Sequence, residues 1–142
     1  MDQSLIFWPM IAHVVLIMIV YLELGRRRYL AGKAGQIRYS DYRVVGAKAE
    51  PESCGKAARN IVNNFELPML FHIVAMALFL TNLASLPQLV LAWLFVVSRY
   101  LHSLVHLTGN NVKHRATWFF LGFFVLAAMW VLFALSLSAD TL

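Results

Sequence analysis

Charged residues are scarce in this chain of 142 amino acids. Aspartate, glutamate, lysine and arginine together make up 13% of the sequence, whereas hydrophobic residues make up 61%. A soluble domain has about 25% charged and about 45–50% apolar residues, so the composition excludes an ordinary soluble fold. Acidic residues are the scarcer of the two charged classes, with seven against twelve basic ones. The chain is therefore expected to lie in a membrane.

The chain also lacks the features of a disulfide scaffold and of a cleavable leader. It has one cysteine, Cys54, which excludes an intrachain disulfide and argues against a cysteine-rich metal site. We expect Cys54 to be a passive thiol in a loop, and we expect no bound metal. The N-terminus has no basic segment and no cleavage site, and the first apolar run ends in GRRR at residues 25–28. That run should therefore stay in the protein as a membrane span.

Four apolar runs have the length that a membrane span requires. A hydrocarbon layer of about 30 Å takes about 20 helical residues to cross. The runs cover residues 5–24, 57–81, 86–107 and 117–137. The sequence thus predicts an all-α fold, an integral membrane four-helix bundle that forms one domain over residues 1–142.

The basic residues indicate how the bundle is oriented. Eight of the twelve lie between residues 26 and 56, and Lys113 and Arg115 lie between the third and fourth runs. Basic loops face the cytoplasm in most membrane proteins, so both chain termini should lie on the non-cytoplasmic side. We expect a bacterial inner membrane, a polar loop over residues 25–55, and no nucleic acid partner for the net charge of +5.

Two of the apolar runs carry a polar stripe. With 100° of rotation per helical residue, Arg59, Asn63 and Glu66 fall within about 60° of arc. A second stripe ends the third run, and its members span an arc of about 100°; they are Arg99, His102, Ser103 and His106.

Both stripes should occupy the cytoplasmic half of the bilayer, because the second run enters there and the third run ends there. A charge that faces lipid costs about 2.5 kcal/mol or more, so we expect the stripes to meet inside the bundle. They would form either a polar network that fixes helix packing or a pocket for an anionic ligand that opens toward the cytoplasm.

The histidines do not form an obvious haem site. At about 1.5 Å per residue, His72 lies about 24 Å along the second run, whereas His102 lies about 7 Å from the end of the third. These depths do not match, and His13 and His72 are expected to be bundle histidines with hydrogen-bond partners. The outer halves of the spans show no continuous polar track for protons or ions.

The two stripes, followed by Arg115 at the start of the fourth run, resemble the membrane-associated proteins in eicosanoid and glutathione metabolism, the MAPEG family. The resemblance extends over the whole chain. It implies a homotrimer of four-helix bundles that binds glutathione as a co-substrate between subunits, near the cytoplasmic side. It also implies a transferase or peroxidase that conjugates or reduces a lipophilic small molecule in the bilayer.

The resemblance assigns a role to each polar residue by position. Asn63 and Glu66 would hold the glutathione peptide, and Arg115 would be the catalytic residue beside its thiol. The remaining glutathione-binding residues would be Arg26, Arg59, Arg99, His102 and His106.

Four positions depart from the prostaglandin-synthase-like members of the family. Those members have an arginine, a tyrosine, a serine and a second tyrosine where this chain has Val62, His106, Ala116 and Phe119. A non-catalytic membrane protein of the same fold, with a structural or ligand-binding role, is therefore the alternative interpretation.

Overall fold

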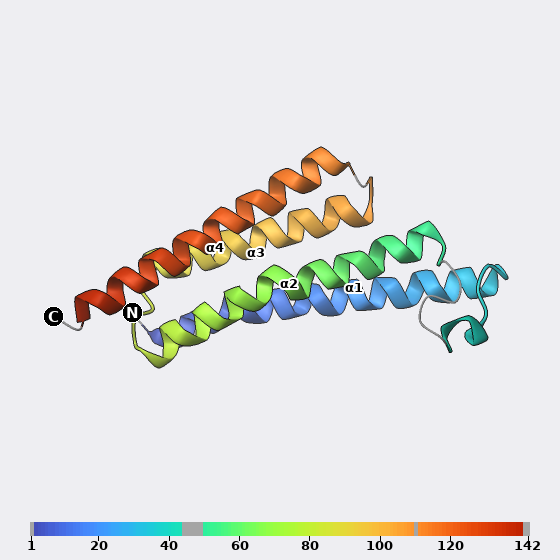
Figure 1. The fold of residues 1–142 in the computed structure, drawn as a ribbon. Helices are drawn as coiled ribbons and strands as arrows, with labels where there is room; N and C mark the ends of the chain where they lie inside the picture. The colour runs from blue at the N-terminus through green and yellow to red at the C-terminus, as the bar shows by residue number, and fades with distance from the viewer. Residues whose placement is uncertain (1, 44–49, 110, 141–142) are drawn as a thin grey trace.

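The computed structural model describes residues 2–43, 50–109 and 111–140, and all the regular secondary structure in these residues is helical (Figure 1). The long helices are α1 (Phe7–Lys33), α2 (Glu52–Leu80), α3 (Leu86–Leu107) and α4 (Val112–Asp140). Two short 3-10 helices, η1 (Gln3–Ile6) and η2 (Tyr39–Tyr42), precede and follow α1. All four long helices are long and apolar enough to cross a membrane, as the sequence predicts.

The helices form two antiparallel pairs, α1 with α2 and α3 with α4, that run side by side (Figure 1). The N- and C-terminal ends lie together at one end of the bundle, next to the turn between α2 and α3. The other end holds the last turns of α1, the start of α2, the end of α3 and the start of α4. We call it the basic end, since both basic segments of the sequence meet there.

The predicted helix bounds are confirmed for α3 and need correction elsewhere. α1 continues to Lys33 rather than ending at residue 24, and α2 and α4 begin five residues before the predicted spans, at Glu52 and Val112. The prediction of a loop over residues 25–55 is therefore wrong at both ends, and Cys54 is buried in α2 rather than in a loop. Arginine, lysine and glutamate favour helix, so the helices continue after the apolar runs have ended.

The turn between α2 and α3 is short and tied to the N-terminus. Asn82 has a φ of 57°, a left-handed conformation that asparagine tolerates. The backbone N–H of Leu83 donates to the carbonyl of Leu78 at 3.0 Å and closes the end of α2. The side chain of Gln3 accepts from the N–H of Ala84 at 2.8 Å and donates to its carbonyl at 3.2 Å. These bonds hold η1 against the turn.

Two apolar clusters fill the bundle. The cluster near the termini includes Phe71 and Phe95, whose rings stack with centroids 4.7 Å apart. The cluster nearer the basic end includes Leu16, Val20 and Leu24 of α1. Histidines join α1 and α2 next to the first cluster: His13 Nδ1 and His72 Nε2 lie 3.1 Å apart. The expectation that these histidines have hydrogen-bond partners is confirmed for this pair of nitrogens. The other ring nitrogen of His13, Nε2, is buried and has no partner among the described residues.

α3 and α4 are in close contact at Gly122. A Cβ atom added to Gly122 would lie 2.6 Å from Ser98 Oγ, which itself donates to the carbonyl of Phe95 at 2.6 Å. The ring of Phe95 lies 3.8 Å from the same point. Even a methyl group at this position requires Ser98 Oγ to move, and a larger side chain would also meet the Phe95 ring.

We therefore expect Gly122→Leu to destabilise the protein by about 1–3 kcal/mol, the usual range for overpacking, and to lower its melting temperature in detergent. Gly25→Leu is the matched control, since an added Cβ at Gly25 meets nothing within 4 Å. Equal melting temperatures for the two variants would show that α3 and α4 are not in close contact at Gly122.

Candidate functional site

The polar stripe of α3 faces the interior, as predicted. Arg99, His102, Ser103 and His106 are at most 2% exposed. The guanidinium of Arg99 lies 5.5 Å from the centre of the Phe119 ring of α4, a distance suited to a cation–π interaction. Among the described residues, none of its three nitrogen atoms has a hydrogen-bond partner. Arg99 is thus a fully buried cation held against an aromatic ring.

The α2 residues that meet this stripe are Asn60 and Asn64, which the sequence analysis did not select. The side-chain amide of Asn64 donates to Asn60 Oδ1 at 2.8 Å and to Ser103 Oγ at 3.1 Å. Asn60 Nδ2 lies 3.1 Å from His106 Nδ1. Asn60 and Asn64 share a helix face with the buried residues Ala57 and Ile61. This shared periodicity is the signal that could have identified them.

Arg59, Asn63 and Glu66 lie on another face of α2. Arg59 and Glu66 are exposed, and Asn63 is half-buried. At 100° per residue, Arg59 and Glu66 point about 160–180° away from Ala57, at the centre of the buried face. The prediction that these three residues share one face is confirmed. The prediction that they meet the α3 stripe inside the bundle is wrong for a single protomer, because two of them point outward.

His102 connects α3 to the first turns of α4. Its Nδ1–H donates to the backbone carbonyl of Arg115 at 3.1 Å, and its ring lies 6.0 Å from that of Phe119. Arg115 is half-buried in α4. The bond holds the start of α4, and with it Arg115, against α3.

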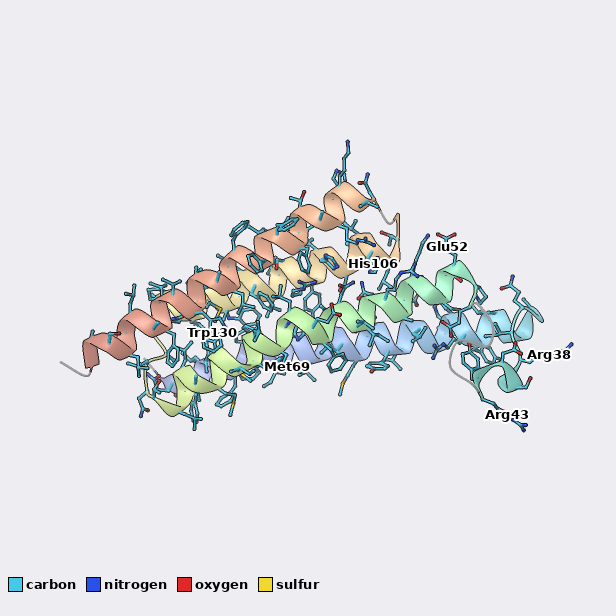
Figure 2. All side chains as sticks on the ribbon, viewed as in Figure 1. Arg38, Arg43, Glu52, Met69, His106 and Trp130 are labelled. Atoms are coloured by element: carbon cyan, nitrogen blue, oxygen red, sulfur yellow. The ribbon has the colours of Figure 1, made fainter. Side chains whose placement is uncertain are left out.

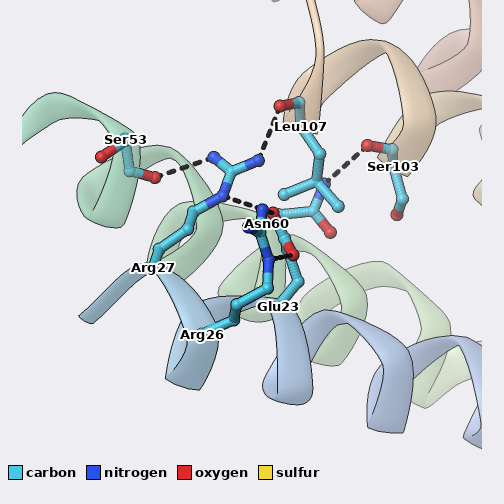
Figure 3. A network of polar contacts seen from close by, with 7 residues as sticks. All are labelled: Glu23, Arg26, Arg27, Ser53, Asn60, Ser103 and Leu107. Atoms are coloured by element: carbon cyan, nitrogen blue, oxygen red, sulfur yellow. Dashed lines mark hydrogen bonds and ion pairs between the residues drawn. The ribbon is translucent and has the colours of Figure 1, made fainter. Parts of the chain in front are cut away.

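A second polar network joins three helices at the basic end (Figure 3). Arg27 of α1 donates to the carboxylate of Glu23 at 2.7 Å, to the backbone carbonyl of Ser53 at 2.9 Å and to that of Leu107 at 2.8 Å. It therefore connects α1 to the start of α2 and to the end of α3. Arg26 binds the same Glu23 carboxylate through two nitrogens, at 2.7 and 2.9 Å, but its side chain is 62% exposed.

A cavity of about 570 Å³ opens beside this network. Its volume falls in the range of small-molecule sites, about 300–1,000 Å³. The cavity is bounded by α1, the start of α2 and the end of α3. It is lined by Arg26, Arg27, Leu30, Ala31, Gln36, Glu52, Ser53, Lys56, Leu107 and Thr108. Figure 2 shows that Glu52 and His106 belong to this same end of the bundle.

The predicted site residues thus fall into three groups in one protomer. The first lies on the outward face of α2 (Arg59, Asn63, Glu66), the second is buried against α4 (Arg99, His102, His106), and the third lies at the basic end (Arg26, Arg115). The protomer does not gather them around one cavity. Among the described residues, no three histidine, cysteine or acidic side chains cluster as a metal site would need.

A comparison with protein families matches the MAPEG family over residues 6–135. The match spans nearly the whole described bundle, from η1 to the last turns of α4. The chain belongs to the MAPEG family. It is an integral membrane protein with four membrane-spanning helices. No curated protein and no solved structure matches the chain.

Two neighbouring arginines of this MAPEG protein should differ in their effect on stability. The side chain of Arg27 is 14% exposed, and Arg27→Gln breaks its hydrogen bonds to two backbone carbonyls and one carboxylate. We therefore expect the free energy of unfolding to fall by about 1–3 kcal/mol. Arg26→Gln removes an exposed pair within one helix and should change the melting temperature little. Thermal unfolding of both variants in detergent compares them directly. A larger effect for Arg26 would contradict the bridging role of Arg27.

Proposed function

We propose that this protein is a glutathione-dependent transferase or peroxidase that acts on lipophilic electrophiles at the cytoplasmic side of a bacterial inner membrane. One observation carries the proposal: the outward face of α2 presents Arg59, Asn63 and Glu66 within a membrane-spanning helix. Two charges and an amide on a surface that would otherwise meet lipid require a polar partner.

A second copy of the chain would cover part of this face. Family membership favours a homotrimer, in which the outward face of one α2 is covered by a neighbouring protomer. The apolar side chains around the stripe support burial there, since Val62, Phe65 and Met69 are 47–60% exposed in the single protomer. Such a surface, apolar with a few polar groups, resembles the core of a stable interface.

Glutathione would be the polar ligand of this face, because its charges complement those of the stripe. It carries two carboxylates and one ammonium group. Glu66 would accept hydrogen bonds from the ammonium, Asn63 would bind a peptide group, and arginines such as Arg59 and Arg26 would bind the carboxylates. Arg99, His102 and His106 would act from the interior, by holding α3 and the start of α4 in position.

Arg115 is the residue proposed to activate the thiol. A free thiol has a pKa of about 8.5, and a nearby guanidinium favours the thiolate, which is the nucleophile. The thiol proton passes to water, the sulfur forms a C–S bond with an aryl carbon, and a halide leaves with the electron pair of the C–X bond. Lipophilic electrophiles concentrate in the bilayer, so a site next to lipid brings them to the water-soluble thiol.

A non-catalytic role within the same family is the second candidate. It is favoured by the burial of His102 and His106, which are 2% and 1% exposed and contact other residues of the bundle. In that case the polar groups of α3 would serve packing alone, and the basic end would bind ligands without chemistry.

Isothermal titration of glutathione into the detergent-purified protein separates these candidates. We expect saturable binding, and we expect Glu66→Leu to weaken it more than Glu66→Gln, because glutamine keeps a hydrogen-bond acceptor. Leu80→Ala is the control, since Leu80 is 71% exposed, carries no charge and lies at the end of the same helix far from the stripe. The absence of saturable heat with the unmodified protein would favour the non-catalytic role.

A second test concerns the thiol itself. In the Arg115→Ala variant we expect the pKa of the thiol of bound glutathione to rise by about one unit or more. Thiolate absorbance at neutral pH should fall while glutathione still binds, and turnover of an aryl halide should fall and partly recover as the pH rises. A variant that keeps both its thiolate signal and its turnover would show that Arg115 only anchors the start of α4.

A further inference from the structure

The cavity at the basic end lies at one particular level of the membrane. The apolar run of α1 ends at Leu24, just before Arg26 and Arg27; that of α2 begins at Ala57, just after Lys56. The third run ends at Leu107, which lines the cavity itself. The apolar runs of α1, α2 and α3 therefore all end beside this one cavity. The ends of the apolar runs mark the depth at which lipid headgroups are expected, so the cavity should lie among the headgroups.

The charges around the cavity leave an excess of one positive unit. Three cations line it, Arg26, Arg27 and Lys56. Two carboxylates are paired with them: Glu23 binds both arginines, and Glu52 Oε1 lies 2.8 Å from Lys56 Nζ. Three positive charges against two negative ones leave +1. A ligand with one negative charge matches this balance.

The partner of Lys56 is weakly held. The side chain of Glu52 is 78% exposed, whereas that of Lys56 is 23% exposed. Exposed ion pairs between neighbouring helical turns contribute little stability. An anion in the cavity can therefore replace Glu52 as the partner of Lys56, and the hydroxyl-bearing residues Ser53 and Thr108 line the same space.

An exposed apolar stripe on α1 continues from the cavity into the membrane. Leu22, Met18, Val15 and Ile11 lie three or four residues apart on the helix face that carries Arg26. They are 75%, 61%, 44% and 51% exposed. The stripe can pack along an acyl chain whose headgroup enters the cavity, and a small water-soluble anion would make no use of it.

We propose that this cavity binds the phosphodiester of an anionic phospholipid, with an acyl chain along the exposed stripe of α1. The site lies within one protomer, whereas the proposed glutathione site uses the outward face of α2 and a neighbouring protomer. The two sites share Arg26, which lines the cavity. The lipid site requires no glutathione binding and no catalysis. Arg27 forms its inner wall, Lys56 pairs with the phosphate, and Glu52 competes with it.

The test is a titration of the delipidated, detergent-solubilised protein with phosphatidylglycerol, followed by native mass spectrometry. Phosphatidylcholine serves as the lipid without net charge, and we expect it to bind more weakly. Lys56→Gln should weaken phosphatidylglycerol binding about fivefold, the effect of about 1 kcal/mol per basic residue at a membrane surface. Glu52→Gln should strengthen it, because a competing carboxylate is lost. Lys33→Gln, which removes the same charge outside the cavity, should leave it unchanged.

The opposite signs of the two cavity variants distinguish a binding role from a folding role, since misfolding does not increase affinity. The proposal is overturned if phosphatidylglycerol and phosphatidylcholine bind equally, or if neither Lys56→Gln nor Glu52→Gln changes the affinity. Inorganic phosphate in excess should not displace the lipid, and displacement would assign the cavity to free phosphate. Glutathione that displaces the lipid would instead make the cavity part of the glutathione site.

Discussion

A polar group inside a bilayer has no water to bind, and this constraint shapes the polar contacts between the helices. Each unsatisfied backbone or side-chain group costs several kcal/mol in hydrocarbon. The helices accordingly bind one another through side chains. Tyr100 of α3 donates to the carbonyl of Ala12 in α1 at 2.8 Å, and Gln88 donates to the carbonyl of Met129 in α4 at 3.0 Å. Arg27 adds the contacts at the basic end. These bonds add to the apolar contacts between the helices.

The same constraint gives the two faces of α2 different functions. Asn60 and Asn64 turn inward and bind α3 through their side-chain nitrogens, whereas Asn64 Oδ1 has no hydrogen-bond partner among the described residues. Arg59 and Glu66 turn outward, where the protomer offers them no interior. The inner face explains how the protomer folds. The outer face requires a further partner, and the neighbouring protomer and glutathione that we propose would supply apolar cover and opposite charges.

Periodicity predicted which residues share a face, but not which neighbour that face meets. It correctly grouped Arg59 with Glu66, and Arg99 with His106, since these relations depend only on rotation along one helix. It could not decide between Asn60 and Asn63, because in a membrane protein polar residues mark inner faces and subunit interfaces alike. Hydropathy predicted the end of α3 correctly but placed the end of α1 too early. Hydropathy indicates where the apolar run ends, whereas the helix of α1 continues past that point through charged residues to Lys33.

We expect the outward polar face of α2 to be covered by protein and not by lipid. A spin label at Val62 tests it most directly, because Val62 is 54% exposed beside the stripe and its replacement leaves Arg59 and Glu66 intact. The label would be introduced in a Cys54→Ser background and compared with one at Leu22 on α1, which is 75% exposed. The account predicts low accessibility to membrane-dissolved oxygen at Val62 and high accessibility at Leu22. Equally high accessibility at both positions would contradict it.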